Sequence, residues 1–547
     1  MMLIYNARIY SLDSDQPAAS SMMIQGERIL SIGEEVAVRA EFEGTCGSGR
    51  MEEIDLGGRV ALPGMIDAHI HLEYYALGLQ KVNCETSTRA ECLVRIAERA
   101  RSTPPGAWIL GHGWNQNDWP EGYGTAADLD AVAPRNPVFL TGRSLHTSWT
   151  NSIGLKLVNI SATTPDPPGG RLGRLANGEP DGILFESAAD LVASVIPQPT
   201  PEELVQAIDA AQSTLWRMGL TGVHDFDRRD CFNALQTLHQ RGGLHLRVLK
   251  SIPREDLPHA AALGLRSGFG DEYLSIGGVK LFSDGALGPH TAAMIAPYIG
   301  EPENTGMLFL DAEELFEIGR QAVDGGISLA VHAIGDRANH EVLKGFKLLR
   351  EYEDSLHRNR VPPLRSARNS VSTRMLRHRI EHVQIIDPQD AGKLAELGVV
   401  ASMQPIHATS DMNMADRFWG ERAAFSYAWK TQLQHGAVLA FGSDAPVESP
   451  NPFWGLHAAV TRRRVDGSPA PEGWYPEQRL TVEQALLAFT RGAAYTAGWE
   501  HRLGKLAPGY LADLIVLDRD PFTCSPDELY TIQPAATMVG GKWVYEE

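Results

Sequence analysis

Residues 61–71 read ALPGMIDAHIH, an apolar run that ends in two histidines separated by one residue. Because side chains alternate along a β-strand, His69 and His71 would point to the same side of such a strand. Imidazole nitrogen is a common ligand of zinc and similar metals. The segment therefore predicts a buried strand that ends in part of a metal site.

Four later stretches repeat this pattern of an apolar run that carries one metal-capable or charged residue near its end. Lys280 lies in LSIGGVKLF, His332 in GISLAVHAIGD, His382 in RIEHVQ and Asp444 in AVLAFGSDAP. In a parallel barrel, residues at the carboxyl ends of the strands converge on one face. We therefore predict that these four residues and the two histidines of the first strand form one hydrolytic metal centre.

The middle of the chain alternates between strand and helix signals. Thr200-Pro201-Glu202-Glu203 is typical of a helix start, with a capping Thr, a Pro in the first turn and a Glu three residues after the cap. A capping residue followed three residues later by Glu or Gln recurs at residues 311–314 and 481–484. Such alternation indicates βα units and a parallel sheet. We predict an α/β fold, a (β/α)8 TIM-type barrel over residues 59–503. One surplus strand, PVFLTG, falls in an inserted lobe at about residues 74–199.

The two ends of the chain resemble each other more than they resemble the middle. Both contain short runs of Val, Ile and Tyr that are cut by Gly and Asp, a pattern typical of antiparallel strands and hairpins. Each end is too small for a core of its own. Residues 1–58 and 504–547 are therefore predicted to pair into one small β-sandwich.

The net charge and the hydrophobic pattern of the sequence indicate which kinds of partner and which cellular compartment to expect. The 547 residues carry a formal net charge of -19, which argues against nucleic acid or an anionic membrane surface as partner. The start of the sequence does not read as a signal peptide, and no apolar run is long enough to span a bilayer. We expect a cytoplasmic protein that acts on a small molecule. A homodimer is compatible with such a barrel, although no sequence feature demands one.

The candidate ligands predict a hydrolytic mechanism. Two metals that share a hydroxide supply a nucleophile at neutral pH and polarise a carbonyl group. His332 and His382 would bind the second metal, whereas Asp444 would bind the first, accept the proton and deliver it to the leaving nitrogen. Lys280 is the unusual member because an ammonium group is not a ligand. It would become one, able to bridge two metals, if CO2 carbamylated it.

The segments HIH, VKLFSDGALG, HAIGDRA, RIEHVQ, SMQPIH and FGSDAPVE resemble the amidohydrolase superfamily, in particular its YtcJ-like (amidohydrolase family 3) branch. The ending GYLADLIVLDRDPF is also similar to that family. The resemblance covers nearly the whole chain. It implies metal-dependent hydrolysis of C–N bonds other than peptide bonds, as in N-substituted formamide deformylases, and it supports a CO2-derived carbamate on Lys280.

The metals are predicted to be two zinc ions, with Mn, Fe and Ni left open because His and carboxylate ligands do not select sharply. The resemblance places His146, in the inserted lobe, among the substrate-pocket candidates. His407 in MQPIH follows a strand and is predicted to contact substrate, and Trp114 is predicted to wall the pocket. Simple packing of the lobe is the competing interpretation for Trp114. Glu381 and Asp336, beside the ligand histidines, are predicted to support them or the fold.

Two other functions remain open. A mononuclear deaminase on the same fold typically carries His-x-x-Glu after the fifth strand, whereas this chain reads His332-Ala-Ile-Gly-Asp336 and has a lysine in the fourth strand. A non-catalytic binding scaffold would be expected to lose ligands, yet all six are present. Ammonia release and metal content separate these alternatives from the amide hydrolase.

Overall fold

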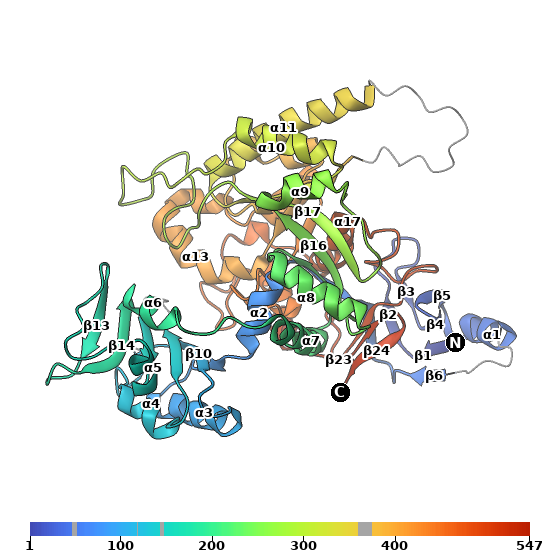
Figure 1. Ribbon diagram of the computed structural model, residues 1–547. Helices are drawn as coiled ribbons and strands as arrows, with labels where there is room; N and C mark the ends of the chain where they lie inside the picture. The colour runs from blue at the N-terminus through green and yellow to red at the C-terminus, as the bar shows by residue number, and fades with distance from the viewer. Residues whose placement is uncertain (46–51, 117–118, 143–146, 359–374) are drawn as a thin grey trace. The chain divides into compact units, whose positions relative to one another are not determined.

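The computed structural model describes residues 1–45, 52–116, 119–142, 147–358 and 375–547. These residues form two compact units (Figure 1). The first contains residues 1–75 and 208–547, and the second contains residues 76–207. Within the described part of the chain, no helix is long and apolar enough to cross a membrane.

Eight parallel strands form the barrel of the first unit, which confirms the predicted fold class. In sheet order, each strand pairs in parallel with the next, and a bridge between Ile70 and Ala445 joins the two ends. The strands are β8 (Met65–Ile70), β15 (Leu220–Asp225), β16 (Arg247–Pro253), β17 (Leu274–Phe282), β18 (Leu329–Ala333), β19 (Arg379–His382), β20 (Val400–Met403) and β21 (Leu439–Phe441).

Helices alternate with these strands, and several begin at the predicted caps. The hydroxyl of Thr200 accepts a hydrogen bond from the backbone N–H of Glu203, and Thr481 caps its helix in the same way. These bonds satisfy N–H groups that have no partner inside the helix. The helices are α7 (Pro201–Arg217), α8 (Arg229–Gln240), α9 (Leu257–Ala262), α10 (Ala312–Asp324), α11 (Asp336–Arg358), α12 (Lys393–Leu397), α13 (Pro405–Trp419), α14 (Trp429–His435), α15 (Pro452–Thr461), α16 (Val482–Leu487) and α17 (Ala493–Ala497).

Segments from both termini build two further sheets. One has the order β5-β4-β1-β6 and the other β24-β23-β22-β7-β2-β3. Ile4 and Met22 of the first sheet share a buried cluster with Leu514 and Met538 of the second. The elements are β1 (Met2–Tyr5), β2 (Arg8–Tyr10), β3 (Ala18–Ala19), β4 (Ser21–Gln25), β5 (Arg28–Gly33), α1 (Glu35–Thr45), β6 (Glu52–Asp55), β7 (Val60–Pro63), β22 (Leu514–Leu517), β23 (Pro534–Val539) and β24 (Lys542–Glu546).

Gly64 separates the terminal sheets from the barrel. The run ALPGMIDAHIH, predicted to be one strand, forms two strands, because β7 pairs with β22 whereas β8 pairs with β15. A Cβ atom at Gly64 would lie 2.3 Å from Cγ2 of Thr221. Only glycine fits here without a shift of Thr221, so the chain can pass from one sheet to the other at this residue.

The second unit is built on a six-stranded sheet with the order β13-β14-β12-β11-β10-β9. Its core includes the side chains of Trp114, Trp119 and Trp149. PVFLTG forms the strand β11 of this sheet. The elements are α2 (Leu72–Leu79), which runs across the boundary, β9 (Val82–Asn83), α3 (Arg89–Ser102), β10 (Ile109–Trp114), α4 (Ala126–Val132), β11 (Val138–Gly142), β12 (Thr147–Thr150), α5 (Ser152–Leu157), β13 (Gly170–Arg174), β14 (Pro180–Glu186) and α6 (Ala188–Ala193).

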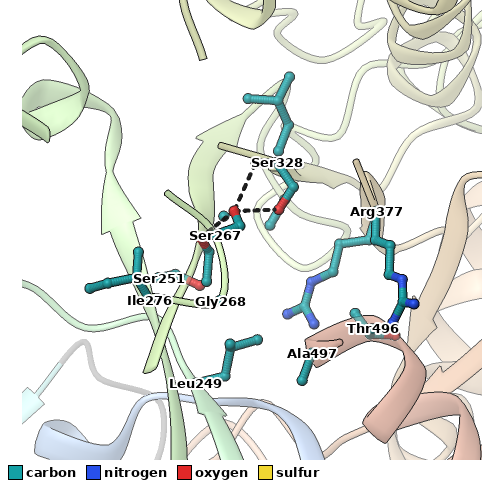
Figure 2. Close-up of a pocket in the computed structure, with 14 residues that line it drawn as sticks. Leu249, Ser251, Ser267, Gly268, Ile276, Ser328, Arg377, Thr496 and Ala497 are labelled. Atoms are coloured by element: carbon teal, nitrogen blue, oxygen red, sulfur yellow. Dashed lines mark hydrogen bonds between the residues drawn. The ribbon is translucent and has the colours of Figure 1, made fainter. Parts of the chain in front are cut away.

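A small polar cavity of about 30 Å³ lies inside the first unit. Figure 2 shows residues that line it. Ile276 lines it and precedes Lys280 on β17, while Arg379 lines it and precedes His382 on β19. The cavity therefore lies toward the amino ends of these strands, away from the candidate ligands. Its volume has room for about one water molecule.

Candidate metal centre

The two histidines of the first barrel strand converge on Asp444. His69 is the penultimate residue of β8 and His71 follows its end. The Nε2 atoms of His69 and His71 each lie 3.5 Å from Oδ1 of Asp444. The backbone also joins these segments, because Asp444 N–H donates to the carbonyl of His69 (2.7 Å) and His71 N–H donates to that of Ala445 (2.8 Å). The strands therefore hold the three side chains in register.

Carboxylates on the far side of each imidazole fix the direction in which it points. Nδ1–H of His69 donates to Oε2 of Glu381 (2.7 Å), and Nδ1–H of His71 donates to Oδ1 of Asp227 (2.9 Å). A histidine that donates through Nδ1 presents the lone pair of Nε2. Both rings therefore offer a ligand nitrogen toward Asp444.

His332 and His382 complete the cluster of imidazoles. Their ring centroids lie 4.7 Å apart, and that of His382 lies 5.0 Å from that of His69. Nδ1–H of His382 donates to Oε1 of Gln404 (2.8 Å), which leaves its Nε2 free for a metal. Nε2–H of His332 donates to the carbonyl of Gly285 (3.0 Å), which leaves its Nδ1 free.

Lys280 lies within the same cluster. Its Nζ is 3.4 Å from Nε2 of His69 and lies over the rings of Phe226 and Phe282, 4.3 and 5.0 Å from their centroids. Only 5% of the residue is exposed, and among the described residues no carboxylate forms a salt bridge with it. Burial lowers the pKa of Lys280 to about 8. A neutral amine is therefore far easier to form here than on an exposed lysine.

Burial also keeps three of the imidazoles neutral. It lowers the pKa of His332 to about 4, and it lowers the pKa values of His69 and His382 well below the ordinary value. The positive charge of Lys280 contributes to the lowering at His69 and His332. Metal ligation requires neutral imidazole, so these rings are in the ligating form at neutral pH without a further change.

Backbone strain coincides with the candidate ligands. His382, Val383 and Asp444 have φ angles of 72°, 41° and 62°, in the left-handed region that non-glycine residues rarely adopt. Such conformations persist where the surrounding structure requires them, and they gather at functional sites. At Asp444, this conformation accompanies a carboxylate whose Oδ1 lies 3.5 Å from the Nε2 atoms of both His69 and His71.

Among the predicted substrate contacts, His407 lies beside the cluster. It is on α13, its ring stacks on that of His382 with centroids 6.1 Å apart and planes 16° apart, and it is 8% exposed. Trp114 is buried in the core of the second unit, and its indole N–H donates to the carbonyl of Leu140 (2.9 Å). These contacts agree with the packing interpretation, and a substrate contact of Trp114 stays a prediction. His146 lies outside the described residues.

Several partners of the candidate ligands were not singled out by sequence. Asp227 and Gln404 hold the rings of His71 and His382, and Asp284 lies 3.5 Å from Nε2 of His332. Each follows a barrel strand by no more than two residues. The stretch LTGVHDFD, two aspartates directly after an apolar run, was the available signal for Asp227. Asp336 hydrogen-bonds the backbone of Ile295 rather than a ligand histidine.

The fold is a (β/α)8 barrel, and the cluster of candidate ligands lies at the carboxyl ends of its strands. Active sites of enzymes with this fold are found at that end of the barrel. The chain belongs to the amidohydrolase family, whose sequence profile matches residues 52–545. It is therefore a hydrolase of that family.

Three similar proteins illustrate the relationship. The putative amidohydrolase YtcJ of Bacillus subtilis is 31% identical, over 98% of both chains. The N-substituted formamide deformylase of Arthrobacter pascens is 29% identical, over 100% of this chain and 98% of its own. The crystal structure of an uncharacterized metal-dependent hydrolase from Pyrococcus horikoshii superimposes with a TM-score of 0.76 at 28% identity, over 96% of this chain and 99% of the other.

Proposed function

We propose that this chain is a dinuclear metal-dependent amidohydrolase that cleaves an amide-type C–N bond in a small molecule. The observation that carries the proposal is the convergence of two imidazole Nε2 atoms on one carboxylate oxygen, at 3.5 Å each. The similarity to a formamide deformylase over the full chain supports the choice of bond. The similarity to a metal-dependent hydrolase supports the requirement for metal.

The donor set fits two divalent metals. His69, His71 and Asp444 would hold the first, and ligand atoms of His69, His382 and Asp444 all lie within 4.8 Å of one another. His332 and His382 would hold the second, since each has one ring nitrogen engaged by the protein and one free. Imidazole and carboxylate donors suit zinc, with manganese, iron and nickel as alternatives.

Lys280 would join the two metals as a carbamate. An ammonium that is buried without a carboxylate partner is costly, and its conversion removes that charge. In this reaction the neutral Nζ amine adds to the carbon of CO2, an N–C bond forms, and one proton is released. The resulting group carries two oxygens and a negative charge, so a buried cation is replaced by a ligand in the position where Nζ lies 3.4 Å from His69.

Asp444 carries the proton in the proposed reaction. When bound, divalent metals supply Lewis acidity and a hydrolytic nucleophile at neutral pH. The Asp444 carboxylate accepts the proton that the nucleophile releases and delivers it to the leaving nitrogen, so that the amine departs neutral. Its side chain is 13% exposed, which leaves it accessible to substrate while Glu381 and Asp227 keep the histidines in place.

The test is a hydrolysis screen with the metal-loaded protein. The panel contains N-formyl amines, N-acyl amino acids, cyclic amides, carbamates and aryl esters, and ammonia release is measured alongside. We expect turnover of an amide-type compound, its loss in Lys280→Ala, and partial recovery when a short carboxylic acid is added to replace the carbamate oxygens. Lys505→Ala, which removes an ion pair with Asp13 in another part of the unit, is the matched control. Normal turnover in Lys280→Ala would contradict the bridging role.

A further inference from the structure

A buried lysine that sequence analysis did not single out lies behind the candidate metal centre. Lys250 is in the middle of β16 and is 2% exposed. Its Nζ is 2.9 Å from Oδ2 of Asp225, which is fully buried, and it also donates to the carbonyls of Asp227 and Ser251. Lysine is almost never buried this deeply unless it is paired. The ammonium therefore ties β16 to the residues at the end of β15.

Asp225 extends this contact to the segment that follows His71. Its Oδ1 accepts a hydrogen bond from the backbone N–H of Leu72 (2.9 Å), and its Oδ2 accepts one from that of Asp227 (3.3 Å). Leu72 is the residue directly after His71. One carboxylate thus fixes the backbone on both sides of the contact between His71 and Asp227.

Asp227 makes the final link to the ring. Its Oδ1 accepts from Nδ1–H of His71 (2.9 Å) and its Oδ2 accepts from the backbone N–H of Glu73 (2.5 Å). Both carboxylate oxygens are therefore used, and Asp227 is 2% exposed. A change in the position of Asp227 would rotate or release the imidazole.

The other histidine of the pair has a separate support. Glu381 accepts from Nδ1–H of His69 and forms an ion pair with Arg379, and all three residues are buried. Each histidine thus has a carboxylate behind it, Asp227 for His71 and Glu381 for His69. Arg379 pairs with Glu381 directly, whereas Lys250 pairs with Asp225 and donates to the backbone carbonyl of Asp227. In the part of the chain that the structure describes, Lys250 makes no hydrogen bond or ion pair with His69, Glu381 or Arg379. Loss of Lys250 should affect the His71 side selectively.

Resting on the proposed function, we infer that Lys250 is a positioning residue which, through Asp225 and Asp227, holds His71 with its Nε2 directed at the first metal. Groups that orient a metal-ligating histidine commonly change metal affinity by about 10–100-fold when they are removed. Lys250 itself touches neither metal nor substrate in this scheme. Its contribution is to pair with the Asp225 carboxylate and to hold the backbone carbonyl of Asp227.

The same residues also resemble a metal site. Ligand atoms of Asp225, Asp227 and Cys231 lie within 4.8 Å of one another. The ammonium of Lys250 already lies on Asp225, and Asp227 is taken up by His71 and Glu73. Asp225 is thus paired with a lysine and Asp227 with a ligand histidine, so both carboxylates already have partners.

The experiment compares two variants that each remove a buried cation from the same strand. Lys250→Met removes the proposed support. Arg247→Met, the matched control, removes the guanidinium that pairs with Asp513 (2.5 and 2.7 Å) at the first residue of β16, the amino end of the strand. Zn²⁺ affinity is measured by competition with a chelating dye, and thermal unfolding is recorded for each protein. Neither readout requires a substrate.

We expect Lys250→Met to weaken binding of one of the two Zn²⁺ ions by about 10–100-fold and Arg247→Met to leave both affinities unchanged although it lowers stability. Asp227→Asn should reproduce the loss. If Lys250→Met does not fold, Asp225→Asn combined with Lys250→Met removes both charges of the Asp225–Lys250 pair, so that neither partner is left buried without the other, and the protein should fold with the same weakened binding.

Parent-like Zn²⁺ affinity in the folded Lys250 variants would overturn the inference, as would an equal loss of affinity in Arg247→Met. A parent chain that binds two Zn²⁺ ions but hydrolyses no amide contradicts the proposed function while the affinity comparison still decides the role of Lys250. A parent chain that binds no Zn²⁺ contradicts both.

Discussion

The variant Asp444→Asn should remove the proton transfer by this carboxylate while it leaves the stability of the protein nearly unchanged. The φ angle of Asp444 is 62°, a conformation that asparagine tolerates better than most residues. Asparagine has nearly the same size, and the hydrogen bond from the backbone N–H to His69 does not depend on the side chain. We therefore expect the free energy of unfolding to change by no more than about 1 kcal/mol.

The expected effect on turnover is much larger. An amide cannot accept the proton, and loss of a general base typically costs about 10²–10⁴-fold in rate, which corresponds to about 2.7–5.5 kcal/mol of transition-state stabilisation. Oδ1 also lies 3.5 Å from the Nε2 atoms of His69 and His71, so metal affinity should fall as well. The two effects are separated when kcat is measured at saturating metal.

The assay compares kcat of the parent and Asp444→Asn at equal metal content per chain, with the best substrate of the panel. Asp520→Asn is the control, because this carboxylate follows β22 and pairs with Arg8 of β2 (2.7 Å), and its loss should leave kcat unchanged. If Asp444→Asn with full metal occupancy keeps kcat within one order of magnitude of the parent, Asp444 is not the general base.

Three further predictions follow from the same geometry. Chelation should abolish hydrolysis and lower the thermal midpoint, because metal binds the native state, and added metal should restore both; activity that survives chelation would exclude a metal mechanism. Gly64→Ala should destabilise the protein by about 1–3 kcal/mol in urea, because the new Cβ meets Thr221, whereas Gly44→Ala, with no atom within 4 Å, should not; equal stabilities would contradict the packing argument. Glu381→Gln should cost about 3–5 kcal/mol in stability and weaken metal binding, because it leaves the buried Arg379 without its carboxylate; an unchanged melting curve and affinity would refute this.

The barrel could be predicted from the sequence because its strands are short apolar runs separated by capped helices. The caps at Thr200 and Thr481 are local, so the spacing of Thr and Glu or Gln was sufficient to find them. The division at Gly64 could not be predicted in this way, because the apolar pattern continues through it. It depends on the pairing of β7 with β22, which comes from the opposite end of the chain.

The candidate ligands could be predicted as residue types at strand ends, but their partners could not. Glu381 is 312 positions from His69, and Asp227 is 156 positions from His71. Which carboxylate meets which imidazole depends on the register between strands that are not neighbours in sequence. The role of Lys250 could not be predicted for a related reason, since a single lysine in an apolar strand gives no local indication of the carboxylate that it pairs with.

The most direct test of the dinuclear hydrolytic centre is the metal content of the purified, reconstituted chain, measured together with that of Lys280→Ala. We expect about two divalent metals per parent chain, as in two-metal hydrolytic sites, and loss of metal and turnover together in the variant. A parent chain that is fully active with one metal, or a Lys280→Ala variant that keeps both metals and normal turnover, would contradict the account.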